Sequence, residues 1–175
     1  MSKSITDVLF YEHNQILKTK ELLERWNGLW EKNPQAFEES IQFLLEFCQQ
    51  YADKIHHHKE EEILFPALMD NNPMLEQGAI GEMLDHHEML REHMANIQQY
   101  ITDKNHQKTY QEFNKYLNLL EDHIAIENDE VFPMSEDAFS DSEKEKLYFQ
   151  MLDFDQEMAS KKHELEEKLN QLLKA

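Results

Sequence analysis

Apolar residues recur three or four positions apart along most of the chain, which is the period of an amphipathic α-helix. β-Branched residues are sparse and no alternating pattern is present, so the sequence predicts no strand. Polar breaks, several of them with Pro, separate the periodic stretches. The pattern predicts helices at about residues 4–31, 34 to 66 or 70, 74–102, 108–132 and 140–173.

Signals for helix ends support this division of the chain. Pro34 follows a polar break and suits the first turn of a new helix. Ser4 with Asp7 has the spacing of a capping box, and so does Ser140 with Glu143. The connecting loops are expected at residues 71–73, 103–106 and 135–140.

Long helices joined by short loops favour an all-α fold. We expect residues 1–134 to form an up-down-up-down four-helix bundle. Residues 135–175 are expected to form a loop and an additional C-terminal helix. That helix packs either on the bundle or on a partner, so the sequence leaves open a homodimer formed through the C-terminal helix.

Composition narrows the class of protein further. The 175 residues include three Gly and four Pro, and good helix formers dominate. The formal net charge of −19 repels phosphates and anionic lipids, so neither nucleic acid nor a membrane is expected as a partner. No apolar run has the length of a signal peptide or a transmembrane span, and a cytoplasmic location is expected.

The single cysteine, Cys48, excludes a disulfide within the chain and argues against a cysteine-based metal site. Its apolar neighbours favour packing in the core over a role as a nucleophile. No Ser or Cys stands beside a suitable base. The sequence therefore assigns no catalytic residue, and a conventional hydrolase is not expected.

One motif occurs twice, on the second and on the fourth expected helix. Residues 56–66 read HHHKEEEILFP, and residues 123–133 read HIAIENDEVFP. Both segments contain His-x-x-x-Glu, then an apolar pair, and a Pro ten residues after the first His. A bundle with pseudo-two-fold symmetry would bring the two segments face to face.

The His-x-x-x-Glu spacing places an imidazole and a carboxylate on one face of a helix. Imidazole suits iron, copper, zinc and nickel, whereas carboxylate suits harder ions, so the mixture fits iron or manganese well. A carboxylate can also bridge two metal ions. An inward Glu is costly unless it is paired or bound to metal, which makes His56 with Glu60 and His123 with Glu127 candidate ligands.

Helical phase identifies two further inward histidines. His13 lies in the apolar stripe of the first helix, and His87 lies in that of the third, with His86 to its side. Three His-x-x-x-Glu pairs overlap on the second helix, and both the repeat and the apolar phase select His56. The remaining histidines are interpreted as surface residues: His57, His58, His86, His93, His106 and His163.

These motifs resemble the hemerythrin-like, or HHE cation-binding, family over about residues 5–134. The matching pieces are EHNQI at 12–16, HHHKEE at 56–61 leading to LFP, MLDHH at 83–87 followed by Arg91, and HIAIE at 123–127 leading to VFP. The resemblance implies a bundle with two iron ions in a non-haem di-iron centre with an oxo or hydroxo bridge, although other divalent metals stay open. It implies the following ligands: His13 and His56 on one iron, His87 and His123 on the other, and Glu60 and Glu127 bridging both.

The sequence differs from the oxygen-carrying hemerythrins of that family. Those proteins have a second His four residues from the first on the third helix, and an Asp five residues after the fourth-helix His. The corresponding positions here are Met83, Arg91 and Asn128. Four His and two Glu remain, as in the iron-centre repair proteins of the family. This ligand count leaves about one open position on each metal.

Three functional hypotheses follow from these features. The expected function is a di-iron protein that binds or senses oxygen, nitric oxide or peroxide. The alternative is an enzyme of oxidative or nitrosative stress, which reduces peroxide or nitric oxide or repairs iron centres at the same site. The third is an iron-dependent interaction module whose C-terminal helix docks a partner.

Overall fold

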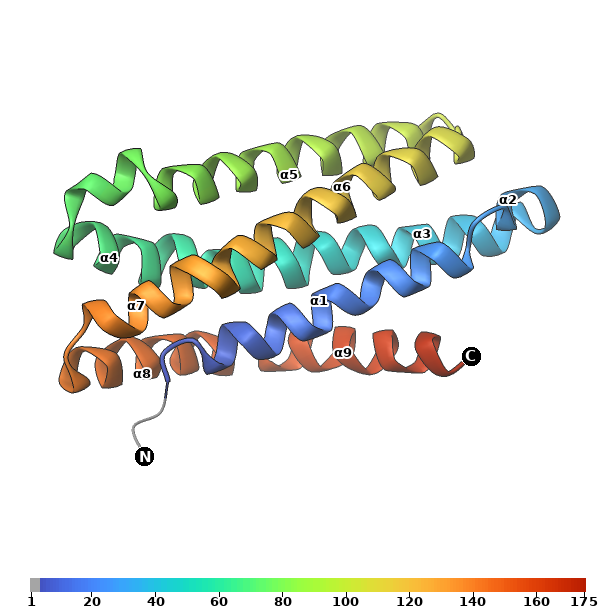
Figure 1. The fold of residues 1–175 in the computed structure, drawn as a ribbon. Coiled ribbons are helices and arrows are strands. Elements are labelled where there is room, and N and C mark those ends of the chain that lie inside the picture. Colours follow the sequence, from blue (N-terminus) through green and yellow to red (C-terminus); the bar gives the residue numbers. More distant parts are fainter. Residues whose placement is uncertain (1–3) are drawn as a thin grey trace.

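The structure is a computed structural model and describes residues 4–175. These residues form an all-helical bundle without strands, which confirms the predicted all-α class (Figure 1). No helix in the described part of the chain is both long and apolar enough to cross a membrane.

The first expected helix is divided in two. Helix α1 covers Asp7–Arg25, and the short helix α2 covers Leu29–Lys32. Gly28 lies between them with a left-handed φ of 71°, a conformation that glycine adopts without steric cost. The capping box predicted at Ser4 is wrong: the Ser4 hydroxyl is hydrogen-bonded to the neighbouring Thr6 and to Glu136 of the fourth helical segment, more than a hundred residues later in the chain.

The second helical segment starts as predicted, because the Asn33 side chain accepts a hydrogen bond from the backbone N–H of Ala36. Its middle part is π-helical, with wider turns than an α-helix. The predicted end near residue 70 is confirmed. The segment consists of α3 (Pro34–Phe47), η1 (Cys48–His57), η2 (Glu60–Leu64) and α4 (Phe65–Asn71).

The third segment is the 3-10 turn η3 (Pro73–Gln77) followed by α5 (Ala79–Thr102). The fourth consists of α6 (His106–Ile126), the π-helical η4 (Glu127–Val131) and α7 (Phe132–Ala138). The loop predicted at 135–140 is wrong over most of its length, because α7 continues to Ala138.

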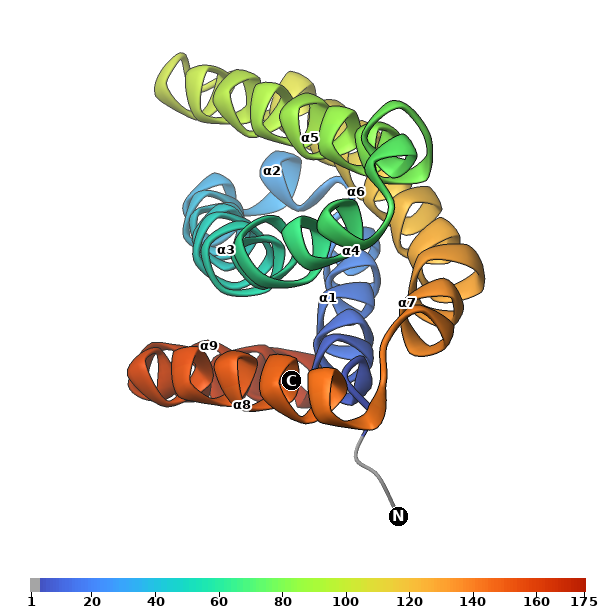
Figure 2. The same ribbon diagram turned by 90° about the vertical axis from the view of Figure 1, so that its left-hand side faces the viewer.

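The C-terminal region consists of α8 (Asp141–Glu157) and α9 (Ala159–Lys174), separated by a short break at Met158. The predicted capping box of Ser140 and Glu143 is confirmed at the start of α8. Figure 2 shows α8 and α9 on one side of the bundle, beside α1 and away from α5. They pack on their own chain. A homodimer through them, and the domain division after residue 134, stay predictions.

Helices α5 and α6 lie side by side, and α1 packs against both α6 and α9. The interior contains two separate apolar clusters. The first apolar cluster includes Ile16, Phe47, Ala52, Leu90, Phe113 and Ile124. The second apolar cluster includes Leu9, Leu64, Phe65, Met83, Val131 and Phe132.

Candidate metal centre

The candidate ligands form a polar layer between the two apolar clusters. In α1, for example, Leu9 belongs to the second cluster and Ile16 to the first, and His13 lies between them. His87 lies in the same way between Met83 and Leu90 of α5. The fold thus brings together, in the buried interior, the six residues that the sequence singled out: His13, His56, Glu60, His87, His123 and Glu127.

The histidines form two close pairs. The Nε2 atoms of His13 and His56 lie 2.8 Å apart. The Nε2 atoms of His87 and His123 lie 3.1 Å apart. Ligand atoms at about 2.1 Å from one ion, and at right angles to each other, are separated by about 3.0 Å. Each pair therefore has the spacing of neighbouring ligands on a single ion.

Both glutamates reach from one histidine pair to the other. The Oε2 atom of Glu127 lies 3.2 Å from Nε2 of His13 and 3.3 Å from Nε2 of His123. Glu60 places Oε1 3.3 Å from Nε2 of His56, and its Oε2 lies 3.5 Å from Nε2 of His87. This arrangement suits carboxylates that bridge two metal ions.

The buried carboxylates lack the partners that a metal-free core would need. Glu60 and Glu127 are fully buried, and none of their four oxygens accepts a hydrogen bond of good geometry within residues 4–175. Burial raises the pKa of both carboxyls well above the usual value, and the Glu127 charge raises that of Glu60 further. A buried charge is costly without a counter-charge. Two cations at this position would supply it, so the residues fit a pair of metal ions.

Most of the histidines are held in the neutral form that binds metal. Burial lowers the pKa of His13 to about 4. Burial also lowers the pKa values of His56 and His123 well below the usual range. His87 differs: burial lowers its pKa, but the nearby carboxylates of Glu60 and Glu61 outweigh burial, and its pKa is raised.

Three of these histidines have their second ring nitrogen fixed by a polar side chain. Nδ1 of His13 lies 2.8 Å from the Asn128 side-chain oxygen. Nδ1 of His56 lies 3.0 Å from Glu12, and Nδ1 of His87 lies 2.7 Å from Glu61. Such partners fix the tautomer and direct the opposite nitrogen toward a metal. Sequence reasoning did not identify these partners, although Glu12 stands directly before His13 in the family motif.

The C-terminal helices contact one of these histidine partners, Glu12. Glu12 accepts hydrogen bonds from the ammonium groups of Lys59 and Lys162. Asp155 of α8 also pairs with both lysines. Lys59 is fully buried, so this network compensates a charge that would otherwise be costly in the core. The helices α8 and α9 therefore help to hold the Glu12 carboxylate against His56.

The surface interpretation of His57 is wrong. Its side chain is 1 % exposed, and its ring stacks on that of His87 at 3.9 Å between centroids. A π-helix has more residues in each turn than an α-helix, so His56 and His57 are separated by a smaller rotation than α-helical phase predicts. His86 is half-buried, 5.7 Å from His123 between ring centroids. The prediction is confirmed for the exposed His58 and His163.

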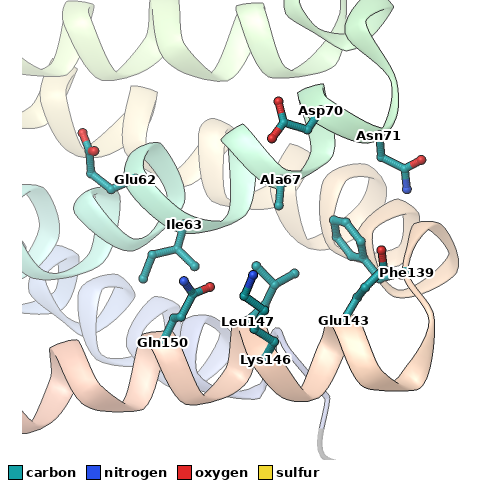
Figure 3. Close-up of a pocket in the computed structure, with 10 residues that line it drawn as sticks. All are labelled: Glu62, Ile63, Ala67, Asp70, Asn71, Phe139, Glu143, Lys146, Leu147 and Gln150. Carbon is teal, nitrogen blue, oxygen red and sulfur yellow. The ribbon is translucent and has the colours of Figure 1, made fainter.

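Surface pockets lie near the site but outside the polar layer. One groove, of about 440 Å³, runs between η2–α4 and α8; it has a mixed polar and apolar lining and none of the candidate ligands (Figure 3). A second pocket, of about 370 Å³, is lined by Asp53, Glu61 and Arg91 among others. The Glu61 carboxylate in its wall contacts Nδ1 of His87, so solvent in this pocket reaches a residue that contacts a candidate ligand.

Comparison with known proteins identifies a family. A model of the hemerythrin HHE cation binding domain matches residues 4–135. The search of curated proteins and the search of solved structures found no match. The matched range contains all six residues that the sequence predicted as ligands and ends before α8.

Proposed function

The chain belongs to the hemerythrin HHE cation-binding domain family, and from this premise we propose that its metal centre is a non-haem di-iron site in an up-down-up-down four-helix bundle. The proposed ligands of the two irons are His13 with His56 and His87 with His123, bridged by Glu60 and Glu127. The observation that carries the proposal is the pair of buried carboxylates, each facing one histidine of both pairs and neither accepting a hydrogen bond within residues 4–175.

We propose that the protein binds or senses oxygen, nitric oxide or peroxide in the cytoplasm. Two bound irons supply a change of oxidation state and open positions for a small ligand. The chain supplies neutral imidazoles, and the two apolar clusters exclude bulk water from both sides of the polar layer. Glu12 and Glu61 hold Nδ1 of His56 and His87, which keeps the Nε2 atoms aimed at the ions.

The alternative function is reduction of peroxide or nitric oxide, or iron-centre repair, at the same site. The observation that favours it is the pocket lined by Arg91 and Glu61. Arg91 lies 2.7 Å from Glu61, which in turn lies 2.7 Å from Nδ1 of His87. Glu61, which Arg91 holds in place, thus lies between the solvent of this pocket and a proposed ligand, and we propose that its carboxylate carries protons between them. An electron donor would have to come from another molecule.

The test is metal analysis with an absorption spectrum, on protein purified from iron-supplied cells. We expect about two irons per chain and near-ultraviolet bands in the wild type, and loss of both in His56→Ala. His163→Ala is the matched control, since His163 is exposed and its ring pairs with Glu167, which is not a proposed ligand. A colourless wild-type protein with less than about half a metal per chain would overturn the proposal.

Small ligands then separate the two functions. Spectral changes with azide, nitric oxide or peroxide, without consumption of peroxide or nitric oxide, would support binding or sensing. Sustained consumption in the presence of a reductant, lost in His56→Ala and retained in His163→Ala, would support the enzyme.

A further inference from the structure

We propose that His57 is a seventh protein ligand, on the ion that His87 and His123 bind, and that the two metal positions are therefore inequivalent. This inference rests on the proposed function, because it assigns a further residue to the same centre. It uses a histidine that neither the repeat nor helical phase selects.

The first observation is a buried imidazole without hydrogen bonds. His57 is 1 % exposed, and neither of its ring nitrogens has a hydrogen-bond partner within residues 4–175. Burying a polar group without a partner costs free energy. The next residue, His58, is exposed on the same turn, and its ring stacks on Phe154. The η1 segment thus directs His57, and not His58, into the interior.

The second observation is the position of His57 among other ligand atoms. His57, Glu60, His87 and His123 each offer one such atom, and these atoms all lie within 4.8 Å of one another. Two ligands on opposite sides of one ion are separated by about 4.2 Å, given metal–ligand distances of about 2.1 Å. The upper limit of 4.8 Å on these separations is therefore close to the size of a site for a single ion.

The third observation is a carboxylate behind the His57 ring. Nδ1 of His57 lies 3.5 Å from Oδ1 of Asp53, which leaves Nε2 for the ion. Arg91 lies 2.9 Å from Asp53 and 2.7 Å from Glu61, the residue that contacts Nδ1 of His87. One guanidinium therefore holds two carboxylates, one behind each of two stacked histidines. Carboxylate–histidine–metal arrangements of this kind are common at metal sites.

The consequence is an asymmetric centre. Three histidines would bind one ion, whereas His13 and His56 alone would supply the nitrogen ligands of the other. Glu60 also belongs to a second group of ligand atoms within 4.8 Å of one another, together with His13, His56 and Glu127. The ion at His13 and His56 would then have one histidine ligand fewer than the other ion.

The experiment compares wild type, His57→Ala and His58→Ala, each loaded with ⁵⁷Fe and studied by Mössbauer spectroscopy. The wild type should give two iron signals of equal intensity. His57→Ala should lose or shift one signal and leave the other in place. In a titration with Co²⁺, one of the two binding steps should weaken at least about tenfold, the lower limit for loss of a residue that supports a metal site. His58→Ala should match the wild type in both measurements.

Two further measurements separate a ligand from a packing residue. Free imidazole added to His57→Ala should restore the lost signal, because a small imidazole can occupy the vacated position. His57→Gln retains most of the side-chain volume, so it serves in place of His57→Ala if circular dichroism shows that the alanine variant has lost helix. It should show the same selective change in one iron signal.

The outcomes distinguish this inference from the proposed function. A colourless wild type with less than about half a metal ion per chain overturns the di-iron proposal itself. A wild type with two irons, together with a folded His57 variant whose Mössbauer and Co²⁺ data are unchanged, overturns only the assignment of His57. Loss of both iron signals together, without rescue by imidazole, also overturns it, because His57 would then support the whole core.

Discussion

Replacing Glu60 by glutamine should change the stability of the metal-free and the metal-loaded protein in opposite directions. Glu60 is fully buried, and no hydrogen bond compensates its carboxylate within residues 4–175. Glutamine has nearly the same shape but carries no charge. The metal-free variant should therefore be more stable than the metal-free wild type, whereas the metal-loaded variant should be less stable than the metal-loaded wild type.

The magnitude follows from the cost of keeping this group in the core. Holding a carboxyl with the usual pKa of 4.5 in its protonated form at pH 7 costs about 3.4 kcal/mol. Contacts of 3.3 Å with His56 and 3.5 Å with His87 offset part of this cost. We therefore expect glutamine to stabilise the metal-free protein by about 1–3 kcal/mol, which raises Tm by roughly 3 °C per kcal/mol for a chain of this size.

The raised pKa also defines how the stability difference between the two metal-free proteins changes with pH. Because the pKa of Glu60 is raised in the folded protein, its contribution to stability is fully present below about pH 4.5 and is lost as the pH rises through the folded pKa. The stability difference between the two metal-free proteins should thus vanish toward pH 4 and grow toward pH 7. With metal bound, the neutral amide is the weaker ligand, and metal-induced stabilisation falls with the affinity.

The assay is thermal unfolding followed by circular dichroism, with and without metal, at several pH values. Glu62→Gln is the matched control, because Glu62 is exposed on the same helix; both of its forms should stay within about 0.5 kcal/mol of wild type. A metal-free Glu60→Gln protein that is less stable than wild type would refute the electrostatic reasoning. Unchanged stabilisation by metal in that variant would refute the role of Glu60 as a ligand.

Three further predictions test other parts of the molecule. Asn128→Leu should lower metal affinity about 10–100-fold in a Co²⁺ titration, because it removes the partner of His13 Nδ1, while Asn128→Asp should retain affinity. Burial raises the pKa of Cys48 to about 12, so a thiol reagent at pH 8 should react with it slowly in the native protein and quickly in denaturant; equal rates would contradict its burial. Gly28→Ala should lower Tm by about 3–6 °C, equivalent to about 1–2 kcal/mol, because φ is 71° there; no atom lies within 4 Å of the added Cβ, so the cost is conformational and not a clash, and an unchanged Tm would rule it out.

Several features could be predicted from the sequence because they depend on local spacing. Apolar periodicity gave the helical segments, and the same phase selected His13 and His87 as inward residues. The repeated His-x-x-x-Glu put His56 with Glu60 on one segment and His123 with Glu127 on another. The structure brings these residues together, and their role as metal ligands stays a prediction. Helix ends were less predictable: the Ser4 hydroxyl does not cap its own helix, because it donates a hydrogen bond to Glu136, which is far away in the chain.

The errors in the polar layer have one local cause. Both His-x-x-x-Glu segments contain π-helical turns, which change the rotation between neighbouring residues and bring His57 inward. Each π-helical segment that carries a glutamate ends directly before a Phe-Pro pair, at Pro66 and at Pro133. Proline lacks the N–H of a regular helical bond, so this repeated pair was the available signal for an irregular turn.

The sequence by itself determined that the chain is helical and which histidines and glutamates share a helix face, because both properties depend on residues within a few turns. Only the tertiary structure decided which side chains contact the second ring nitrogen of those histidines. Asn128, Glu12 and Glu61 meet histidines from other segments. The fully buried Lys59 pairs with Asp155, nearly a hundred residues later in the chain. Such pairs have no common spacing in the chain, since packing between helices, and not the period of any one helix, brings them into contact.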